Sequence, residues 1–105
     1  MICRTGSFLR AGRLTAADAT GLRARSVHLQ AGHQMPWHST RDRQEMILIL
    51  HGAVVLQYQG LGRRVYQRSL RAGRYGLLAP HTLHRVLNST RHMAHYVYVT
   101  APGSP

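Results

Sequence analysis

The stretch that decides the fold reads GHQMPWHSTRDRQEMILILHG and runs from Gly32 to Gly52. It contains Met46–Leu50, an apolar run that ends just before His51 and Gly52. A short apolar run followed by a turn residue is typical of a buried β-strand. A helix is disfavoured, because no window of the chain keeps apolar residues at helical spacing for three turns without a glycine or proline. We therefore expect strands in this stretch.

Outward from this stretch, short runs rich in valine, isoleucine, leucine and tyrosine alternate with turn residues at intervals of about ten residues. This spacing predicts an all-β protein. Eight strands are enough to close a barrel or to form a two-sheet jelly roll. The predicted strands are Arg25–Gln30, Gln34–His38, Gln44–Leu50, Ala53–Gln59, Arg64–Ser69, Arg74–Leu78, His84–Asn88 and Met93–Thr100.

The length of 105 residues suits a single domain. We expect a barrel over about residues 23–101, an irregular or edge-strand lead-in at 1–22, and a mobile tail at 102–105. Met46–Leu50 and Tyr96–Val99 are apolar on both faces, which predicts central strands. One face of these strands would pack on the barrel interior. The other face would be covered by a second sheet or by a partner subunit, so we also predict a homodimer.

Composition narrows the class of protein. No stretch approaches the ~20 apolar residues of a membrane-spanning helix, and the first residues lack the apolar segment of a secretory signal. These features predict a cytoplasmic protein. Cys3 is the single cysteine, so one chain can form neither an internal disulfide nor a cysteine-based zinc site. A bound metal ion would need histidine, carboxylate or water as ligands.

The chain is strongly basic, with a formal net charge of +11 from 14 basic residues against Asp18, Asp42 and Glu45. Such a charge attracts phosphate backbones, which makes nucleic acid a partner to consider. However, all the basic residues are arginines, and they are scattered along the chain rather than gathered into a run. This pattern is typical of compositional bias, so nucleic-acid binding is the weakest of the function hypotheses.

Three residues have the chemistry of a metal site. Glu45, the only glutamate, directly precedes Met46–Leu50, where a buried carboxylate needs a partner. Alternate residues of a strand share a face, so His38 and Glu45 converge if the link at 39–44 places their strands side by side. His84 opens a later strand. Two imidazoles and one carboxylate suit iron, manganese, nickel, copper or zinc, and leave positions open for water or substrate.

These residues resemble the two motifs of the cupin family. Gly32–Gly52 is similar to the first motif, G-x5-H-x-H-x3,4-E-x6-G, with Thr40 in place of the second histidine. Gly73–Asn88 is similar to the second motif, G-x5-P-x-G-x2-H-x3-N, with Pro80 one residue nearer the histidine and Thr82 near the expected glycine. With its flanking strands, the resemblance covers about residues 25–101.

The resemblance implies a small cupin-type double-stranded β-helix, or jelly-roll barrel, that holds one divalent metal ion. The ligands that it implies are His38, Glu45 and His84, and Thr40 leaves the fourth ligand missing. A threonine hydroxyl is a poor replacement for imidazole. Three outcomes stay open: water fills the position, another histidine replaces the ligand, or the metal is lost and the histidines only hydrogen-bond Glu45.

The remaining aromatic and histidine residues have simpler expected roles. His28 and His95 lie within strands, and either is a replacement ligand only if its strand faces inward. His81 is expected at the barrel mouth, and Tyr96 and Tyr98 in the core or at an interface. The histidines beside turns are expected to be solvated, namely His33, His51 and His92.

Two functions fit these expectations, both with a small-molecule partner and no membrane. The first is a metal-dependent enzyme, such as the oxygenases and isomerases implied by the resemblance, acting on a small organic molecule. The second is a non-catalytic module that binds a small ligand in the barrel. Apart from Glu45 the only carboxylates are Asp18 and Asp42, so no separate catalytic acid can be assigned and the catalytic residues stay unknown.

Overall fold

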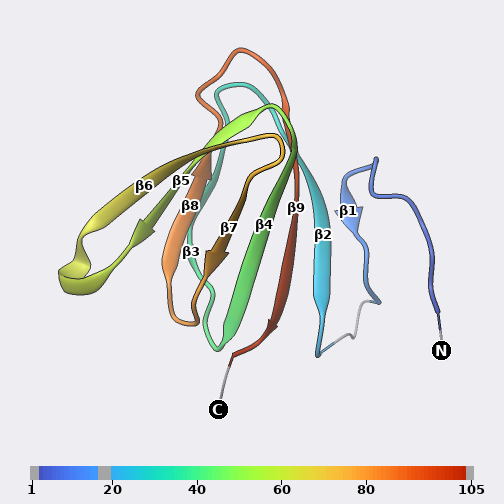
Figure 1. Ribbon diagram of the computed structural model, residues 1–105, viewed down its shortest axis with the longest axis horizontal. Coiled ribbons are helices and arrows are strands. Elements are labelled where there is room, and N and C mark those ends of the chain that lie inside the picture. The colour runs from blue at the N-terminus through green and yellow to red at the C-terminus, as the bar shows by residue number, and fades with distance from the viewer. Residues whose placement is uncertain (1–2, 17–19, 104–105) are drawn as a thin grey trace.

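The structure, a computed structural model, describes residues 3–16 and 20–103 and is built almost entirely of strands (Figure 1). The described residues contain no α-helix and hence no helix that could cross a membrane. The elements are β1 (Gly12–Arg13), β2 (Arg23–Leu29), β3 (Gln34–Ser39), β4 (Arg43–His51), β5 (Ala53–Gln59), the 3-10 turn η1 (Leu61–Arg63), β6 (Val65–Arg71), β7 (Tyr75–Leu78), β8 (Leu83–Leu87) and β9 (Ala94–Pro102).

The strands form two facing antiparallel sheets. The five-stranded sheet has the order β1-β2-β9-β4-β7, and the four-stranded sheet has the order β3-β8-β5-β6. Consecutive strands such as β3 and β4, or β6 and β7, fall in different sheets, and no described pairing closes the sheets into one ring. Of the two all-β arrangements expected from the sequence, the chain therefore adopts the two-sheet jelly roll.

The eight strands predicted from the turn spacing are all present as β2 to β9, with ends displaced by one or two residues. β9 continues to Pro102, and the N–H of Gly103 donates to the Asp42 carbonyl at 2.8 Å. The strand thus includes the first residue of the predicted tail, whose mobility stays a prediction, and residues 104–105 lie outside the described residues. Of the predicted lead-in, β1 is an edge strand on β2, and residues 1–2 and 17–19 also lie outside the described residues.

The core lies between the sheets and follows from strand alternation. In β4, Ile47 and Ile49 are only 1% and 2% exposed, whereas Met46 and Leu48 on the other face are half-buried. Both β4 and β9 have neighbours on each side, as predicted for central strands. The homodimer stays a prediction. The core residues are Val27, Leu29, Ile47, Ile49, Val54, Leu56, Leu70, Leu78, Val86, Ala94 and Tyr96.

Gly52 lets β4 turn directly into β5. Its φ of +78° lies in the left-handed region that favours glycine. A Cβ at this position would lie 2.9 Å from the carbonyl oxygen of Met93 and 3.0 Å from the Cα of Ala94, both of them backbone atoms. The glycine that ends the fold-deciding stretch is therefore required both by its conformation and by the close approach of β9.

Candidate metal centre

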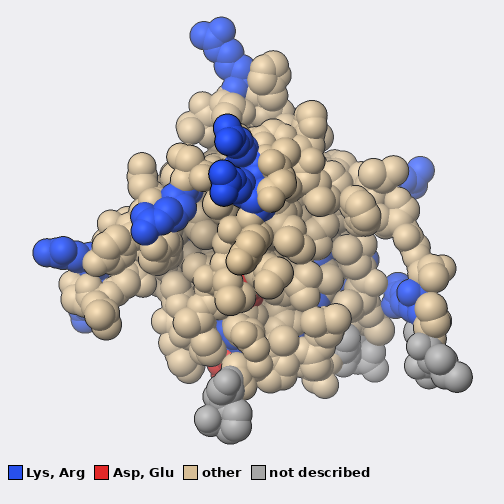
Figure 2. Space-filling view, viewed as in Figure 1, with Lys and Arg blue, Asp and Glu red and all other residues tan. Residues whose placement is uncertain are grey.

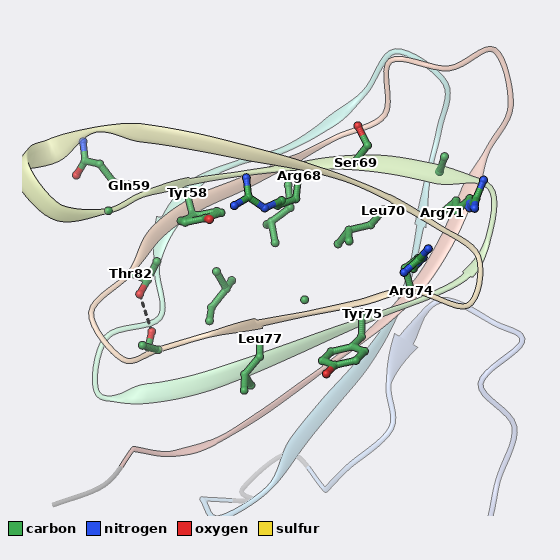
Figure 3. A pocket seen from close by; sticks show the side chains of 16 residues that line it. Tyr58, Gln59, Arg68, Ser69, Leu70, Arg71, Arg74, Tyr75, Leu77 and Thr82 are labelled. Carbon is green, nitrogen blue, oxygen red and sulfur yellow. Dashed lines mark hydrogen bonds between the residues drawn. The ribbon is translucent and has the colours of Figure 1, made fainter.

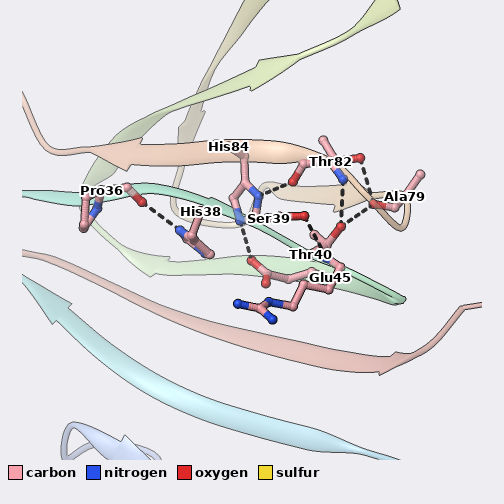
Figure 4. Close-up of polar contacts among 9 residues, drawn as sticks. Pro36, His38, Ser39, Thr40, Glu45, Ala79, Thr82 and His84 are labelled. Atoms are coloured by element: carbon pink, nitrogen blue, oxygen red, sulfur yellow. Dashed lines mark hydrogen bonds and ion pairs between the residues drawn. The ribbon is translucent and has the colours of Figure 1, made fainter.

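The structure brings His38, Glu45 and His84 together, although not by the route expected from the sequence. The expectation that β3 and β4 lie side by side is wrong, because β3 pairs with β8 whereas β4 pairs with β7 and β9. His38 and His84 are direct partners across β3 and β8. Glu45 reaches them from the opposing sheet, so the three side chains meet across the interior rather than along one sheet (Figure 4).

The three side chains, called the triad below, are close enough to share one ion. One ligand atom from each lies within 4.8 Å of the other two. His84 Nε2 is 3.2 Å from Glu45 Oε2, and the rings of His38 and His84 have centroids 4.2 Å apart. His84 is fully buried and Glu45 is 7% exposed, whereas His38 is exposed. The site is therefore closed on two sides and open beside His38.

Hydrogen bonds to backbone carbonyls orient both histidine rings. His38 Nδ1 lies 2.7 Å from the Pro36 carbonyl oxygen, and His84 Nδ1 lies 3.0 Å from the Thr82 carbonyl oxygen (Figure 4). A carbonyl only accepts, so each Nδ1 carries the hydrogen. Each neutral ring then presents the lone pair of Nε2, which is the arrangement found in histidines that bind metals.

The contact between His84 and Glu45 requires a positive charge. A neutral His84 that donates through Nδ1 would point the Nε2 lone pair at a carboxylate oxygen, and two acceptors repel each other. Burial lowers the pKa of His84, but hydrogen bonds to Glu45 and Thr82 and the charge of Glu45 outweigh it and raise the pKa above 6.5. Either a proton or a metal ion satisfies the pair, so the donor set fits a divalent cation.

A small cavity of about 140 Å³ adjoins the triad. Met35 and His38 both line it although they are three residues apart, because a β-bulge shifts the register of β3 between them. The bulge left no signal in the sequence. Tyr96 and Tyr98 line the same cavity, so their expected core role was incomplete. Their alternation along β9 was visible in the sequence, but not which face turns inward.

Tyr96 is a neutral hydrogen-bond donor at this cavity. Burial, followed by the nearby charges of Glu45 and Tyr98, raises the pKa of its phenol well above the ordinary value of 10. The phenol therefore keeps its proton at neutral pH. It can donate a hydrogen bond to a bound molecule, but it cannot act as a base there.

Thr40 supports the triad instead of supplying a ligand. Its hydroxyl donates to the Ala79 carbonyl at 2.8 Å and accepts from the Thr82 N–H at 2.9 Å (Figure 4). These two bonds hold the turn at 79–82, whose Thr82 carbonyl in turn orients His84. Thr40, which stands where the cupin resemblance places a second histidine, thus holds the turn that precedes β8.

His81, rather than Thr82, takes the conformation expected of a glycine in this turn. Its φ is +58°, in the left-handed region that non-glycine residues seldom adopt. The backbone N–H of His81 donates to the Arg41 carbonyl at 2.6 Å, which ties the turn to the β3–β4 link. The side chain is exposed and lies outside the group of ligand atoms that forms the triad.

His28 and His95 lie on the outer face of the five-stranded sheet, because their neighbours Val27 and Tyr96 face the core. Neither can replace the missing ligand. His95 Nε2 lies 2.6 Å from Ser26 Oγ, which donates its single hydrogen to the Phe8 carbonyl at 2.7 Å, so His95 must be the donor. The His28 ring packs edge-on against His95 at 4.5 Å. As expected, the histidines beside turns are exposed, namely His33, His51 and His92.

Comparisons of sequence find no match among family models or curated proteins. Comparisons of structure do find similar folds. The Schizosaccharomyces pombe Cnp3 cupin domain matches with a TM-score of 0.76 and 13% identity, over 88% of this chain and 59% of that one. An oxalate oxidase matches with a TM-score of 0.74 and 20% identity, over 92% and 61% of the two chains.

A Cupin 2 conserved barrel domain protein from Salinispora arenicola CNS-205 matches with a TM-score of 0.72 and 21% identity, over 88% of this chain and 74% of that one. This chain thus spans less than two thirds of the length of the first two structures. At these identities the likeness concerns the fold alone. The chain therefore has the cupin fold, as the resemblance of its two motifs implies.

Proposed function

We propose that this protein binds a divalent transition-metal ion through His38, Glu45 and His84, and that it acts as an oxygenase or isomerase on a small organic molecule. The observation that supports this proposal most is the pair of Nδ1 hydrogen bonds that leave Nε2 of each histidine to act as a ligand, with His84 Nε2 3.2 Å from the Glu45 carboxylate. Three ligands on a cupin-fold scaffold leave coordination positions for water and substrate.

The adjoining cavity limits the size of the substrate. A volume of about 140 Å³ holds about four or five water molecules. A molecule of only a few non-hydrogen atoms fits, such as a two- or three-carbon acid. Oxalate, the substrate in the name of one matching structure, is of this size and is a sensible first compound to test.

The chain's own residues would bind and orient such a molecule. Tyr96 can donate a hydrogen bond to one of its oxygens, and Met35 and Val86 give the cavity apolar walls that limit access of water. A bound metal ion would polarise an oxygen of the substrate or bind dioxygen. The exposed His38 marks the side from which a substrate can enter.

A non-catalytic ligand-binding module is the second candidate, and one observation favours it. The cavity contains no acid or base other than the triad and the two tyrosines, and the Tyr96 phenol stays protonated. A protein of this kind would bind the same small molecules without converting them. Measuring turnover and binding with the same compounds distinguishes the two candidates.

The face of the molecule drawn in Figure 2 gives no support to nucleic-acid binding. Figure 2 shows arginines at several separate places on the visible face, divided by uncharged residues, instead of one continuous patch. A protein that tracks a phosphate backbone concentrates its basic residues along one face. The arginine content therefore stays best explained by composition.

Elemental analysis of the purified protein tests the metal proposal. We expect about one transition-metal ion per chain in the wild type and almost none in His38→Ala or His84→Ala. His92→Ala is the matched control, because His92 is exposed and does not belong to the triad. Equal metal content in the wild type and both triad variants would refute the ligand assignment.

A further inference from the structure

A second and larger space lies away from the triad. This groove of about 940 Å³ opens where β6 and β7, edge strands of different sheets, face each other without pairing (Figure 3). Its floor is apolar, with Leu56, Leu70 and Leu78 at most 8% exposed. Among the described residues, none lines both this groove and the 140 Å³ cavity beside the triad. The groove is therefore independent of the proposed metal site.

Arg68 occupies an inward position in this groove. Its direct partner across β5 and β6 is Leu56, which is 3% exposed, and directly paired residues have their side chains on the same face. Leu70, two residues further along β6, shares that face and belongs to the core. Figure 3 shows the Arg68 side chain directed into the groove. Arg68 is exposed, so its guanidinium stands at the open side of the groove, on the same face of β6 as the buried Leu70.

Among the residues that the structure describes, no negative charge balances this arginine. Its guanidinium donates to the carbonyl of the preceding residue, Gln67, at 3.0 Å from Nη1. No carboxylate lines the groove, since the described acids Asp42 and Glu45 lie in the β3–β4 link and in the triad. Arg71 and Arg74 stand at the end closed by the β6–β7 turn (Figure 3), and their side chains have no hydrogen-bond or ion-pair partner among the described residues. The groove is positive and apolar at once.

We propose that this groove binds an organic carboxylate with an apolar body. The planar guanidinium of Arg68 offers parallel N–H donors that match the two oxygens of a carboxylate. Leu56, Leu70 and the ring of Tyr58 offer an apolar surface to the rest of the molecule. Arg71 and Arg74 add positive potential that attracts an anion. A volume of about 940 Å³ is ample for a medium-chain or aromatic acid.

A purely structural role for Arg68 makes a different prediction. An inward-pointing charge on an edge strand prevents that strand from pairing with another molecule, and β6 is an edge strand. Such a role needs the charge but no ligand. It predicts aggregation of a neutral variant and no preference of the groove for carboxylates.

The experiment is a calorimetric titration of the full chain with octanoate, with 1-octanol and octylamine as neutral and cationic analogues of the same length. We expect octanoate to bind at least about tenfold more tightly than either analogue, because only it forms charge-assisted hydrogen bonds to Arg68. In amide NMR spectra, the signal of Gly76, which lines the groove, should shift on addition of octanoate.

Two pairs of variants complete the test. Arg68→Met should weaken octanoate binding about ten- to hundredfold, whereas Arg91→Met, which removes an exposed arginine between β8 and β9, should leave it unchanged. If Arg68→Met does not fold, Leu77→Glu at the 61% exposed groove rim should weaken binding by repulsion, and Leu77→Gln should not. Binding of octanol equal to that of octanoate, or octanoate binding that survives both Arg68→Met and Leu77→Glu, would overturn the proposal.

Discussion

The fold contains two histidine clusters that differ in their partners. The inner cluster, His38 and His84, lies between the two sheets, and the outer cluster, His28 and His95, lies on the outer face of the five-stranded sheet. Inside, His84 Nε2 lies 3.2 Å from the carboxylate of Glu45, a contact that a proton or a metal ion satisfies. On the outer face, His95 donates to the Ser26 hydroxyl and packs against His28, and no carboxylate of the described residues contacts it. The pKa of His84 is raised, whereas burial and the neighbouring His28 lower the pKa of His95.

The difference shows that burial alone does not give a histidine its function. His84 and His95 are 0% and 8% exposed, so both are buried. The inner ring lies against a carboxylate, a pair that a proton or a metal ion satisfies, whereas the outer ring donates to a neutral hydroxyl. Only the inner cluster is arranged to bind a metal ion.

The largest expected effect comes from removing the carboxylate. Glu45→Gln should lower metal affinity at least about a hundredfold, because it removes the only anionic ligand of the triad. His95→Gln, which changes a histidine as deeply buried in the outer cluster, should leave metal affinity unchanged. Competition with a coloured chelator measures both variants. A similar loss of metal affinity in Glu45→Gln and His95→Gln would show that the inner cluster is not the metal site.

Next in size is the loss of the Thr40 hydroxyl. Thr40→Val should destabilise the fold by about 1–2 kcal/mol, since the part-buried Thr82 N–H loses its acceptor and the Ala79 carbonyl keeps only the Thr82 hydroxyl as a donor. It should also weaken metal binding moderately, because the Thr82 carbonyl no longer holds His84 in place. Urea unfolding and chelator competition provide the measurements. Thr82→Val is the control, since its exposed hydroxyl only donates to Ala79, and Thr40→Ser should behave like the wild type.

A smaller effect concerns pH. The pKa of His95 is lower in the folded state than its ordinary value of 6.5. The unfolded chain therefore binds more protons as pH falls below about 6.5, and stability declines with acidification through this window. Thermal unfolding between pH 8 and pH 5, with metal removed, should show a steeper decline in wild type than in His95→Gln. Parallel curves would mean that the outer cluster does not titrate as a buried neutral histidine does.

Much of this organisation could be predicted from the sequence. Strand positions followed from turn spacing, because glycines such as Gly52 stand where the backbone requires them. The meeting of His38, Glu45 and His84 followed from motif resemblance. The sheet partners could not be predicted, because alternation fixes which residues share a face but not which strands pair. The bulge before His38 was equally hidden, since it depends on the register between β3 and β8.

The face on which Arg68 lies could not be predicted from the sequence either. The sequence placed Arg68 in a strand but gave no reason to choose its face, because Tyr66, Arg68 and Leu70 alternate with residues that are also mixed in polarity. Pairing with Leu56 decides the question. That this exposed charge faces the groove becomes visible only when the partner strand is known.

The smallest expected effect tests whether His81 belongs to neither cluster. His81→Gly should change stability by about 0–1 kcal/mol in the stabilising direction, since relief of the left-handed backbone at +58° slightly exceeds the entropy that glycine adds to the unfolded chain. His92→Gly, at an exposed position without a positive φ, should instead destabilise the fold by about 0.5–1 kcal/mol. Metal affinity should be unchanged in both variants, because neither side chain lies in the triad. A marked loss of metal in His81→Gly alone would make His81 the fourth ligand and would extend the inner cluster to the turn that Thr40 holds.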